Sequence, residues 1–208
     1  MKIHRLITGL LESNAYLLEN ETTGEGVLID CGGDGALIIS TARQLGISLR
    51  AILLTHGHAD HIEGVDRVVK AFSCPVYLHA FDLELLSRPD YNLSTRIFGK
   101  PLSIAAHAVA LQDGDTPEIA GFSPVVLHTP GHTQGSVCYR FKNALFTGDT
   151  LFRDSVGGEF PPFGNLQTEI DSIRSQLFSI GQDCVCYPGH GEQTSLFYEK
   201  QNNDYCRI

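Results

Sequence analysis

The stretch Thr55-His56-Gly57-His58-Ala59-Asp60-His61 carries four potential metal ligands within six residues. It directly follows the apolar run Ala51-Ile52-Leu53-Leu54, which is typical of a buried strand. A strand that ends in such a turn presents its imidazoles and carboxylate at the carboxyl edge of a sheet, where α/β proteins commonly have their sites. The sequence therefore predicts a metal site at this turn, with further ligands supplied by other parts of the chain.

Strand-like segments form two groups along the chain, and each group is mixed with helical segments. The first group comprises expected strands at residues 2–8, 14–19, 26–30, 51–54 and 75–78, with helices at 36–45, 62–72 and 81–86. The second comprises expected strands at 125–128, 136–141, 144–147 and 185–187, with helices at 166–180 and 196–203. This pattern predicts two sheets packed face to face with helices outside, and the length of 208 residues predicts one domain over residues 1–208.

The composition argues against several classes of protein. The 15 basic and 24 acidic residues give a formal charge of −9, which opposes binding to nucleic acid. No apolar run approaches the roughly 18 residues of a membrane span, and no secretory signal is visible, so we expect a cytoplasmic protein without a membrane partner. The six cysteines are expected to be reduced, with Cys184 and Cys186 filling core positions.

Three more of the expected strands are followed by a glycine-flanked His or Asp. Glycine lets the backbone bend sharply and approach a ligand closely, as a site assembled from loops requires. The three stretches are Leu127-His128-Thr129-Pro130-Gly131-His132-Thr133, Phe146-Thr147-Gly148-Asp149-Thr150 and Cys186-Tyr187-Pro188-Gly189-His190-Gly191. Together with the opening turn, they supply the candidate ligands His56, His58, Asp60, His61, His132, Asp149 and His190.

The four motifs T-H-x-H-x-D-H, T-P-G-H-T, G-D-T and P-G-H-G resemble those of the metallo-β-lactamase superfamily, especially its glyoxalase II-like hydrolases. They occur in the family's order between residues 55 and 191. The resemblance implies an αββα sandwich, α/β (α+β) in class, with two mixed β-sheets face to face and a two-metal site at one edge. The implied ligands are His56, His58 and His132 for the first metal, Asp60, His61 and His190 for the second, and Asp149 between them.

The chemistry of the candidate ligands supports this division. Imidazole and carboxylate without thiolate suit Zn²⁺, and also Fe or Mn, better than a soft metal. The two oxygens of Asp149 can serve two ions at the separation of about 3.5–4 Å typical of two-metal sites. Two divalent ions balanced by Asp60, Asp149 and a bridging hydroxide leave a charge of about +1, which favours a developing oxyanion.

These observations predict a metal-dependent hydrolase that cleaves a thioester or related acyl bond of a small molecule. A hydroxide that bridges the two metals, whose parent water has its pKa lowered to about 7, attacks the acyl carbonyl. Asp60 is the candidate catalytic residue, because it can orient this hydroxide while it binds metal.

Two segments are expected to determine which substrate binds. Residues 88–106 lack a regular period and are expected to form a loop or lid over the site, because long irregular segments in compact domains are often functional. The aromatic and proline residues after Asp149, from Phe152 to Phe163, are candidates for a wall of the cleft, although such residues commonly only pack. Arg96, Lys100 and Arg153 are candidates for binding an anionic substrate, although surface solvation is the commoner role of each taken alone.

Two departures from the glyoxalase II-like pattern argue against a glutathione thioester as the substrate. Full-length glyoxalase II proteins carry a C-terminal helical region that helps to bind glutathione, and the chain ends 18 residues after His190. Many small relatives carry a basic residue in the loop after G-D-T-L-F, where this chain has Gly158 and Glu159. A thioester without that glutathione contact is therefore the preferred substrate.

Other functions remain alternatives. The same ligand pattern resembles that of persulfide dioxygenases, which use one iron on the first three histidines, and a lactonase would differ in substrate alone. The missing export signal, and a carboxylate at Asp149 where class B lactamases typically use a thiolate, argue against a β-lactamase. A flavodiiron oxidoreductase would require a carboxylate at position 58, where this chain has His58. A non-enzymatic metal-binding protein is disfavoured because no candidate ligand is missing.

The remaining histidines are predicted to be structural. His4, His79 and His107 have no partner at ligand spacing. His128 lies four residues before His132, so it is a candidate for supporting a ligand, but a packed and hydrogen-bonded imidazole is the preferred interpretation.

Overall fold

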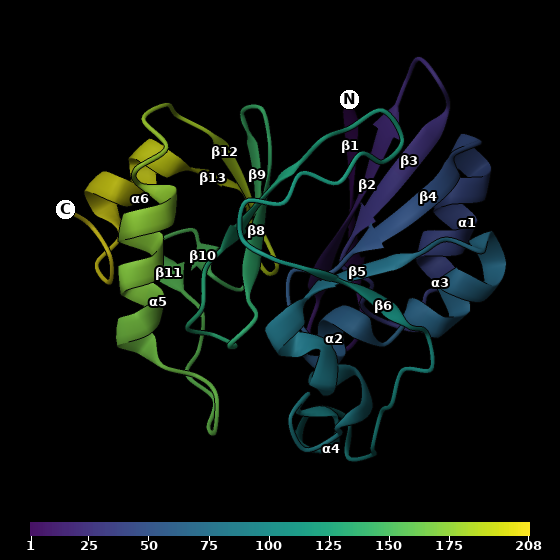
Figure 1. Cartoon of the computed structure of the whole chain (residues 1–208), viewed down its shortest axis with the longest axis horizontal. Helices are drawn as coiled ribbons and strands as arrows, with labels where there is room; N and C mark the ends of the chain where they lie inside the picture. Colours follow the sequence, from purple (N-terminus) through teal and green to yellow (C-terminus); the bar gives the residue numbers. More distant parts are fainter.

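The computed structural model describes residues 1–208 as two β-sheets that pack face to face, with helices on their outer sides (Figure 1). The predicted αββα arrangement is confirmed. The first sheet has the order β1-β2-β3-β4-β5-β6 and the second has the order β13-β12-β9-β8-β7. The first contains β1 (Lys2–Thr8), β2 (Ser13–Asn20), β3 (Glu25–Ile29), β4 (Ser48–Leu53), β5 (Val76–His79) and β6 (Ala108–Leu111). The second contains β7 (Val125–His128), β8 (Val137–Phe141), β9 (Ala144–Gly148), β12 (Val185–Pro188) and β13 (Thr194–Ser195).

Helices cover the outer face of each sheet. Helices α1 (Ala36–Leu45) and α3 (Val65–Phe72) lie on the first sheet, and α5 (Leu166–Ser172) and α6 (Leu196–Asn202) lie on the second (Figure 1). The short helices α2 (Ala59–Ile62) and α4 (Ser94–Phe98) lie at the lower edge in this view. The remaining short elements are the 3-10 helix η1 (Ala80–Ser87), the π-helical turn η2 (Ile173–Leu177), and the hairpin β10 (Leu151–Phe152) and β11 (Ser155–Val156). None of the helices is both long and apolar enough to cross a lipid bilayer.

The directions of the strands bring several of their carboxyl ends to one edge. Strands β3, β4, β5 and β6 run parallel to one another, whereas β1, β2 and β3 form the antiparallel start that the sequence predicted. In the second sheet β9 and β12 are parallel, and β7 runs in the same direction because β8 is antiparallel to both β7 and β9. The segments after these strands therefore meet at a common edge, where α/β proteins commonly have their sites.

Three hydrophobic clusters fill the spaces between the four layers. Leu28 and Ile52 point toward α1 and α3, whereas their neighbours Val27 and Leu53 point toward the second sheet. This alternation follows from the two-residue period of a strand, and burial on both faces explains why the strands read as nearly continuous apolar runs. The third cluster lies between the second sheet and the helices α5 and α6.

The six cysteines are all free and buried. Cys184 and Cys186 belong to the cluster beneath α5 and α6, so their predicted role as core residues is confirmed. Burial raises the pKa of Cys186 well above its usual value, which disfavours a reactive thiolate.

Several element boundaries differ from the sequence-based expectation. The helix expected at 62–72 is two helices, because Gly64 interrupts it and packs against Gly35, whose Cα would lie 2.8 Å from a Cβ at position 64. The apolar period continues across this break because Ile62 and Val65 are both buried, which explains the error. Strand β6 was not expected, since it is an edge strand whose middle residues are exposed and small. The helix expected at 166–180 is shorter and ends in the π-helical turn.

The hydroxyl of Tyr139 connects the second sheet to the end of β4, so its removal should destabilise the fold. Tyr139 is fully buried, and its hydroxyl donates a 2.8 Å hydrogen bond to the carbonyl of Leu54, directly before the ligand-rich turn. We expect Tyr139→Phe to lower the free energy of unfolding by about 1–2 kcal/mol, because the Leu54 carbonyl loses a partner. Urea denaturation measures this, with Tyr77→Phe as control, since the Tyr77 side chain is only partly buried. Equal stability of the two variants would contradict the prediction.

Candidate metal centre

A cavity of about 480 Å³ opens at the edge where the carboxyl ends of the strands meet. Five of the seven predicted ligands line it, namely His58, Asp60, His132, Asp149 and His190. His56 and His61 lie behind them, and at 1% and 0% exposure they are fully buried. The structure therefore brings all seven predicted residues together, from four separate turns of the chain.

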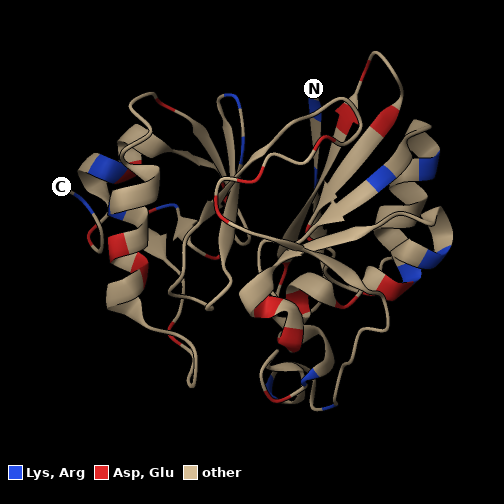
Figure 2. Ribbon diagram, viewed as in Figure 1, with Lys and Arg blue, Asp and Glu red and all other residues tan.

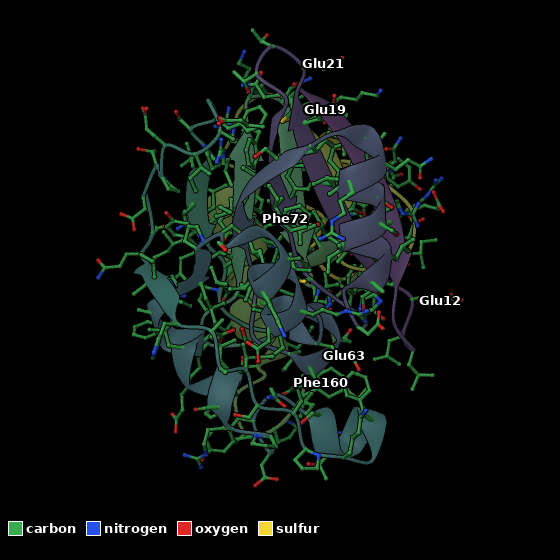
Figure 3. The ribbon with its side chains drawn as sticks, turned by 90° about the vertical axis from the view of Figure 1, so that its right-hand side faces the viewer. Glu12, Glu19, Glu21, Glu63, Phe72 and Phe160 are labelled. Carbon is green, nitrogen blue, oxygen red and sulfur yellow. The ribbon has the colours of Figure 1, made fainter.

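The rest of the cavity wall comes from three segments. The segment 88–106 contributes Leu93, Arg96 and Ile97, so the part expected to lie over the site does line it, although α4 gives it regular structure. The segment after Asp149 contributes Phe152, Gly158 and Phe160, and the turn between β1 and β2 contributes Leu11. Lys100 and Arg153, the other two candidate contacts for an anion, do not line the cavity. Figure 3 shows Phe160 and Glu63 toward the lower end of the molecule, opposite Glu19 and Glu21.

The seven residues form two groups of three with one carboxylate between them. The ligand atoms of His56, His58 and His132 all lie within 4.8 Å of one another, as do those of Asp60, His61 and His190. A third set, His56, His61 and Asp149, is equally close and spans the two groups. The two groups match the division that the family resemblance implied.

Asp149 faces both groups. Its Oδ1 lies 3.3 Å from Nε2 of His61, and its Oδ2 lies 3.5 Å from Nε2 of both His132 and His190. Gly189 permits this arrangement, because a Cβ at that position would lie 2.1 Å from Oδ1 of Asp149. The P-G-H-G motif thus supplies both a histidine and the space for a neighbouring carboxylate.

Four of the five histidines are oriented by hydrogen bonds from the ring nitrogen that faces away from the cluster. Three of these bonds are to a carbonyl or carboxylate oxygen, and the fourth joins His56 to Thr55. Nδ1 of His132 donates to the carbonyl of Gly158 at 2.9 Å, and Nδ1 of His190 donates to the carbonyl of Leu11 at 3.1 Å. Nδ1 of His61 donates to Oδ2 of Asp30 at 3.0 Å. Each of these bonds fixes the orientation of its ring with Nε2 directed at the cluster, which is the arrangement of a metal-binding imidazole.

Asp30 is a functional residue that the sequence reasoning missed. It follows β3, and its carboxylate accepts hydrogen bonds from the backbone N–H and the hydroxyl of Thr55 as well as from His61. The hydroxyl of Thr55 in turn accepts from Nδ1 of His56 at 3.0 Å. The sequence pattern placed Asp30 only at the end of an expected strand. Like the ligand motifs, however, Asp30 is a polar residue directly after an apolar run, Val27-Leu28-Ile29.

Asp82 is a second missed residue, and it connects two ligand-bearing turns. Its fully buried carboxylate accepts hydrogen bonds from the N–H of Gly57 at 2.9 Å, the N–H of Gly135 at 2.7 Å and the hydroxyl of Thr133 at 2.8 Å. Gly57 belongs to the turn of His56 and His58, and Thr133 follows His132. A single carboxylate thereby holds all three histidines of the first group in register.

The charges of the cluster favour cation binding. Burial alone would lower the pKa of His61, but the carboxylates of Asp149, Asp60 and Asp30 outweigh it and raise that pKa well above its usual value. Burial likewise opposes ionisation of Asp60 and Asp149, yet the neighbouring His61 holds the pKa of both carboxyls far below the usual range. The ionised carboxylates of Asp60 and Asp149 therefore lie beside one imidazole.

The first group has the opposite character. Burial, reinforced by His132, lowers the pKa of His58 to about 3, and burial also lowers the pKa of His56 and of His132. These imidazoles are neutral at physiological pH, and Nδ1 of His58 and Nε2 of His132 are hydrogen-bonded at 2.9 Å. Neutral imidazole is the form that binds metal.

The residues present fit a pair of divalent metals. Nε2 of His56 and Oδ1 of Asp149 are buried and make no hydrogen bond, which is costly unless a ligand satisfies them. In the second group, Nε2 of His190 lies 3.2 Å from Oδ2 of Asp60 and 3.3 Å from Nε2 of His61. Atoms bound to one zinc ion at about 2.0–2.2 Å in tetrahedral geometry lie roughly 3.3–3.6 Å apart, so only small movements separate these groups from metal coordination.

The histidines predicted to be structural lie outside the cluster. His4 pairs with Glu19 at 2.8 Å, and His107 is exposed. His79 and His128 stack with their ring centroids 4.1 Å apart, and Nε2 of His128 donates to the carbonyl of Gln134. His128 therefore packs against another sheet instead of supporting a ligand, as preferred from the sequence.

Comparison with known proteins assigns the chain to a family. Residues 8–190 match the metallo-beta-lactamase superfamily, and the chain belongs to that superfamily. It is 34% identical to the probable metallo-hydrolase YqgX of Bacillus subtilis, over 99% of this chain and 97% of that protein. It is 30% identical to hydroxyacylglutathione hydrolase GloC of Haemophilus influenzae, over 99% of this chain and 98% of that protein.

Solved structures of similar proteins include a lactamase and an iron protein. The crystal structure of the BLEG-1 B3 metallo-beta-lactamase superposes with a TM-score of 0.93 at 34% identity and covers 99% of both chains. That of TTHA1623 in a di-iron-bound form superposes with a TM-score of 0.86 at 33% identity, over 97% of this chain and 99% of that one. Similar proteins with different names thus share one fold.

Replacement of Asp82 by Asn should weaken metal retention as well as stability. The amide of Asn must direct an NH₂ group at one of the backbone N–H donors, so at least one hydrogen bond is lost, at a cost of about 1–3 kcal/mol. We expect Asp82→Asn to lower the free energy of unfolding by that amount and to release metal at lower chelator concentration. The control is Asp113→Asn, which alters an exposed carboxylate that accepts one hydrogen bond, from the N–H of His128. Wild-type metal retention in Asp82→Asn would contradict this role.

Glu169 should make the stability of the metal-free protein depend on pH. Its side chain is fully buried next to Gly157; Oε1 accepts the N–H of Gly157 at 2.9 Å and Oε2 has no partner. Burial raises its pKa from 4.5 to about 8, so the folded state binds the proton more tightly than the unfolded state. The stabilisation is therefore complete below pH 4.5 and is lost as the pH rises to about 8.

The variant Glu169→Gln isolates this effect, because the amide stays neutral. In denaturation of metal-free protein, wild type should lose up to about 1.4 kcal/mol per pH unit relative to Glu169→Gln between pH 5 and 8. A constant difference between the two proteins over this range would show that Glu169 does not titrate there.

Proposed function

We propose that the protein is a metal-dependent hydrolase that cleaves thioesters or closely related acyl compounds. The single observation that carries this proposal is the pair of three-residue groups with Asp149 directed at both, at the base of a cavity of about 480 Å³. His56, His58 and His132 would hold one divalent metal, Asp60, His61 and His190 a second, and Asp149 both. Zinc suits the nitrogen and oxygen ligands, and iron remains a candidate because the similar TTHA1623 is described in a di-iron-bound form.

When bound, divalent metals supply a Lewis acid for a carbonyl oxygen and lower the pKa of water to about 7. The protein contributes orientation. Oδ2 of Asp60 accepts a 2.8 Å hydrogen bond from the hydroxyl of Ser13, which fixes the rotation of this carboxylate at the cavity floor. Asp60 is therefore proposed to orient the attacking water. Leu11, Phe152 and Phe160 exclude bulk water from the same floor, which strengthens electrostatic interactions there.

The cavity favours substrates whose leaving group needs no proton donor. Apart from the proposed ligands, Arg96 is the one titratable residue of the lining, and a guanidinium does not release a proton in this pH range. A thiol has a pKa of about 8.5, so a thiolate can depart unprotonated, whereas an amine or alkoxide cannot. The lining thus supports cleavage of a C–S bond to give a carboxylic acid and a thiol, in preference to an unstrained amide.

The comparison with GloC alters one sequence-based expectation. The missing C-terminal helical region was an argument against glutathione thioesters, but a protein called hydroxyacylglutathione hydrolase matches this chain over 98% of its own length. That argument therefore has no force, and glutathione thioesters belong among the candidate substrates. Gly158, one of the two departures after Asp149, has a defined place, since its carbonyl orients His132.

Hydrolysis of β-lactams is a second candidate function. The sequence argued against it because Asp149 stands where a thiolate is typical, yet the similar BLEG-1 is described as a B3 metallo-beta-lactamase over 99% of both chains. A β-lactam is a strained amide, whose ring opening relieves strain and reduces the need for a proton donor.

Loss of single ligands tests the proposed metal centre. We expect His132→Ala and Asp149→Ala to reduce the metal content and to lower kcat/KM for a thioester at least about 10³-fold, because the water is no longer activated. His128→Ala is the matched control, as it removes an imidazole four residues from His132 that lies outside the cluster. Metal analysis and thiol release provide the measurements. Full activity with full metal occupancy in either ligand variant would refute the assignment.

Oxygen consumption separates the hydrolase from the persulfide dioxygenase alternative. We expect the wild-type protein to release thiol from a thioester without oxygen uptake, whichever divalent metal is bound. One iron per chain with oxygen uptake on a persulfide, and no thioester turnover, would replace the proposed function by an oxidative one.

A further inference from the structure

Beyond the proposed ligands, the cavity is an apolar space with one fixed positive charge. Its apolar wall consists of Leu11, Leu93, Ile97, Phe152 and Phe160, and Arg96 is the one Lys or Arg residue of the lining. Figure 2 shows Lys and Arg residues on both halves of the ribbon. The formal charge of −9 repels anions at long range, so a cation in the cavity acts on what has already entered it.

The guanidinium of Arg96 is available for a ligand. It lies on α4 with its central carbon 5.4 Å from the ring centroid of Phe160, and no carboxylate of the protein pairs with it. Two other arginines near the cavity are already paired, since Arg88 binds Glu84 at 2.6 Å and Arg153 lies 3.7 Å from Asp154. Stacking on an aromatic ring leaves the hydrogen-bonding edge of a guanidinium free.

Phe160 connects Arg96 to the metal-binding histidines. Its ring centroid lies 5.7 Å from that of His132 and 6.0 Å from that of His58, in edge-to-face geometry. One phenyl ring therefore separates the guanidinium from the imidazoles of the first group. A molecule with its reacting carbonyl at the histidines can extend along this ring and present a second polar group to Arg96.

We propose that Arg96 binds a carboxylate of the substrate, and that the substrate is an anionic thioester with an apolar segment between its carboxylate and its reacting carbonyl. The proposal rests on the proposed hydrolase function and specifies its substrate class. Arg96 donates hydrogen bonds from its planar guanidinium to the carboxylate, while Phe160 and Ile97 pack against the apolar segment. A carboxylate is preferred because its two oxygens can accept two parallel hydrogen bonds from the planar guanidinium.

Matched pairs of thioesters test this directly. Within a pair, the two compounds share every group except one, which is a carboxylate in the first and a primary amide in the second. One pair carries the group on the acyl half and the other carries it on the thiol half, so the panel also shows which half reaches Arg96. We expect wild type to prefer the carboxylate in one pair, as judged by kcat/KM, and to lose this preference as salt is raised, because Arg96 is exposed to solvent.

The variants separate charge recognition from packing. Arg96→Met should lower kcat/KM for the carboxylate compound about 10-fold or more, as expected of a hydrogen bond to a charged group, and should lower it much less for the amide compound. Arg96→Lys should retain part of the preference. Lys100→Met is the control, because it removes a positive charge from the same segment outside the cavity. An equal loss on both compounds would show that Arg96 only supports Phe160, and no loss on either would also overturn the proposal.

Binding of thioethers, which cannot be hydrolysed, distinguishes failure of this inference from failure of the proposed function. Calorimetry with metal-loaded protein compares the carboxylate and amide forms of each thioether. A carboxylate preference that Arg96→Met abolishes would support the inference even if no thioester were turned over, in which case only the hydrolase assignment would fall. Equal affinity of wild type and Arg96→Met for the carboxylate form would overturn the inference, whatever the turnover.

Discussion

A buried concentration of negative charge at the common edge of the two sheets is the constraint on which the rest of the structure depends. The carboxylates of Asp30, Asp60 and Asp149 surround the imidazole of His61. Buried anions destabilise a fold unless hydrogen bonds or cations compensate them. Ser13, Thr55 and the imidazole N–H groups compensate part of this charge, and the proposed metals would compensate the rest. Metal binding and folding should therefore be coupled in this protein.

The direction of the strands explains how ligands so far apart in sequence meet. Strands β4, β7, β9 and β12 all end at one edge, and the turn after each carries a ligand motif. Strand direction alone does not orient an imidazole, which depends on the hydrogen bonds behind it. Asp30 provides such a bond to the imidazole of His61. Asp82 instead holds the backbone of the two turns that carry the first group, through the N–H groups of Gly57 and Gly135. The catalytic potential of the cluster thus depends on carboxylates that never face the cavity.

Most of the fold and the proposed ligand set were predictable from the sequence, because both depend on local signals. Buried strands appear as apolar runs, and each ligand lies in a short glycine-flanked motif directly after such a run. The residues behind the ligands were not predictable in the same way. Asp82 lies within a 3-10 helix, and Glu169 in α5, with nothing adjacent in sequence that marks their burial. Their roles arise only when distant turns pack against them, and the short edge strand β6 depends likewise on its neighbour in the sheet.

Selectivity has a different structural origin from the proposed chemistry. The ligand motifs lie on turns that the two sheets hold in place, whereas the outer wall of the cavity comes from the segment 88–106 and the loop after Asp149. These two segments belong to opposite halves of the molecule and meet through Arg96 on Phe160 and through Tyr91 on Phe163, whose rings lie 4.9 Å apart. Loops of this kind tolerate sequence change more readily than core strands do. We therefore propose that these two segments select the substrate, and that in this chain the pairing of Arg96 with Phe160 favours one that is both apolar and anionic.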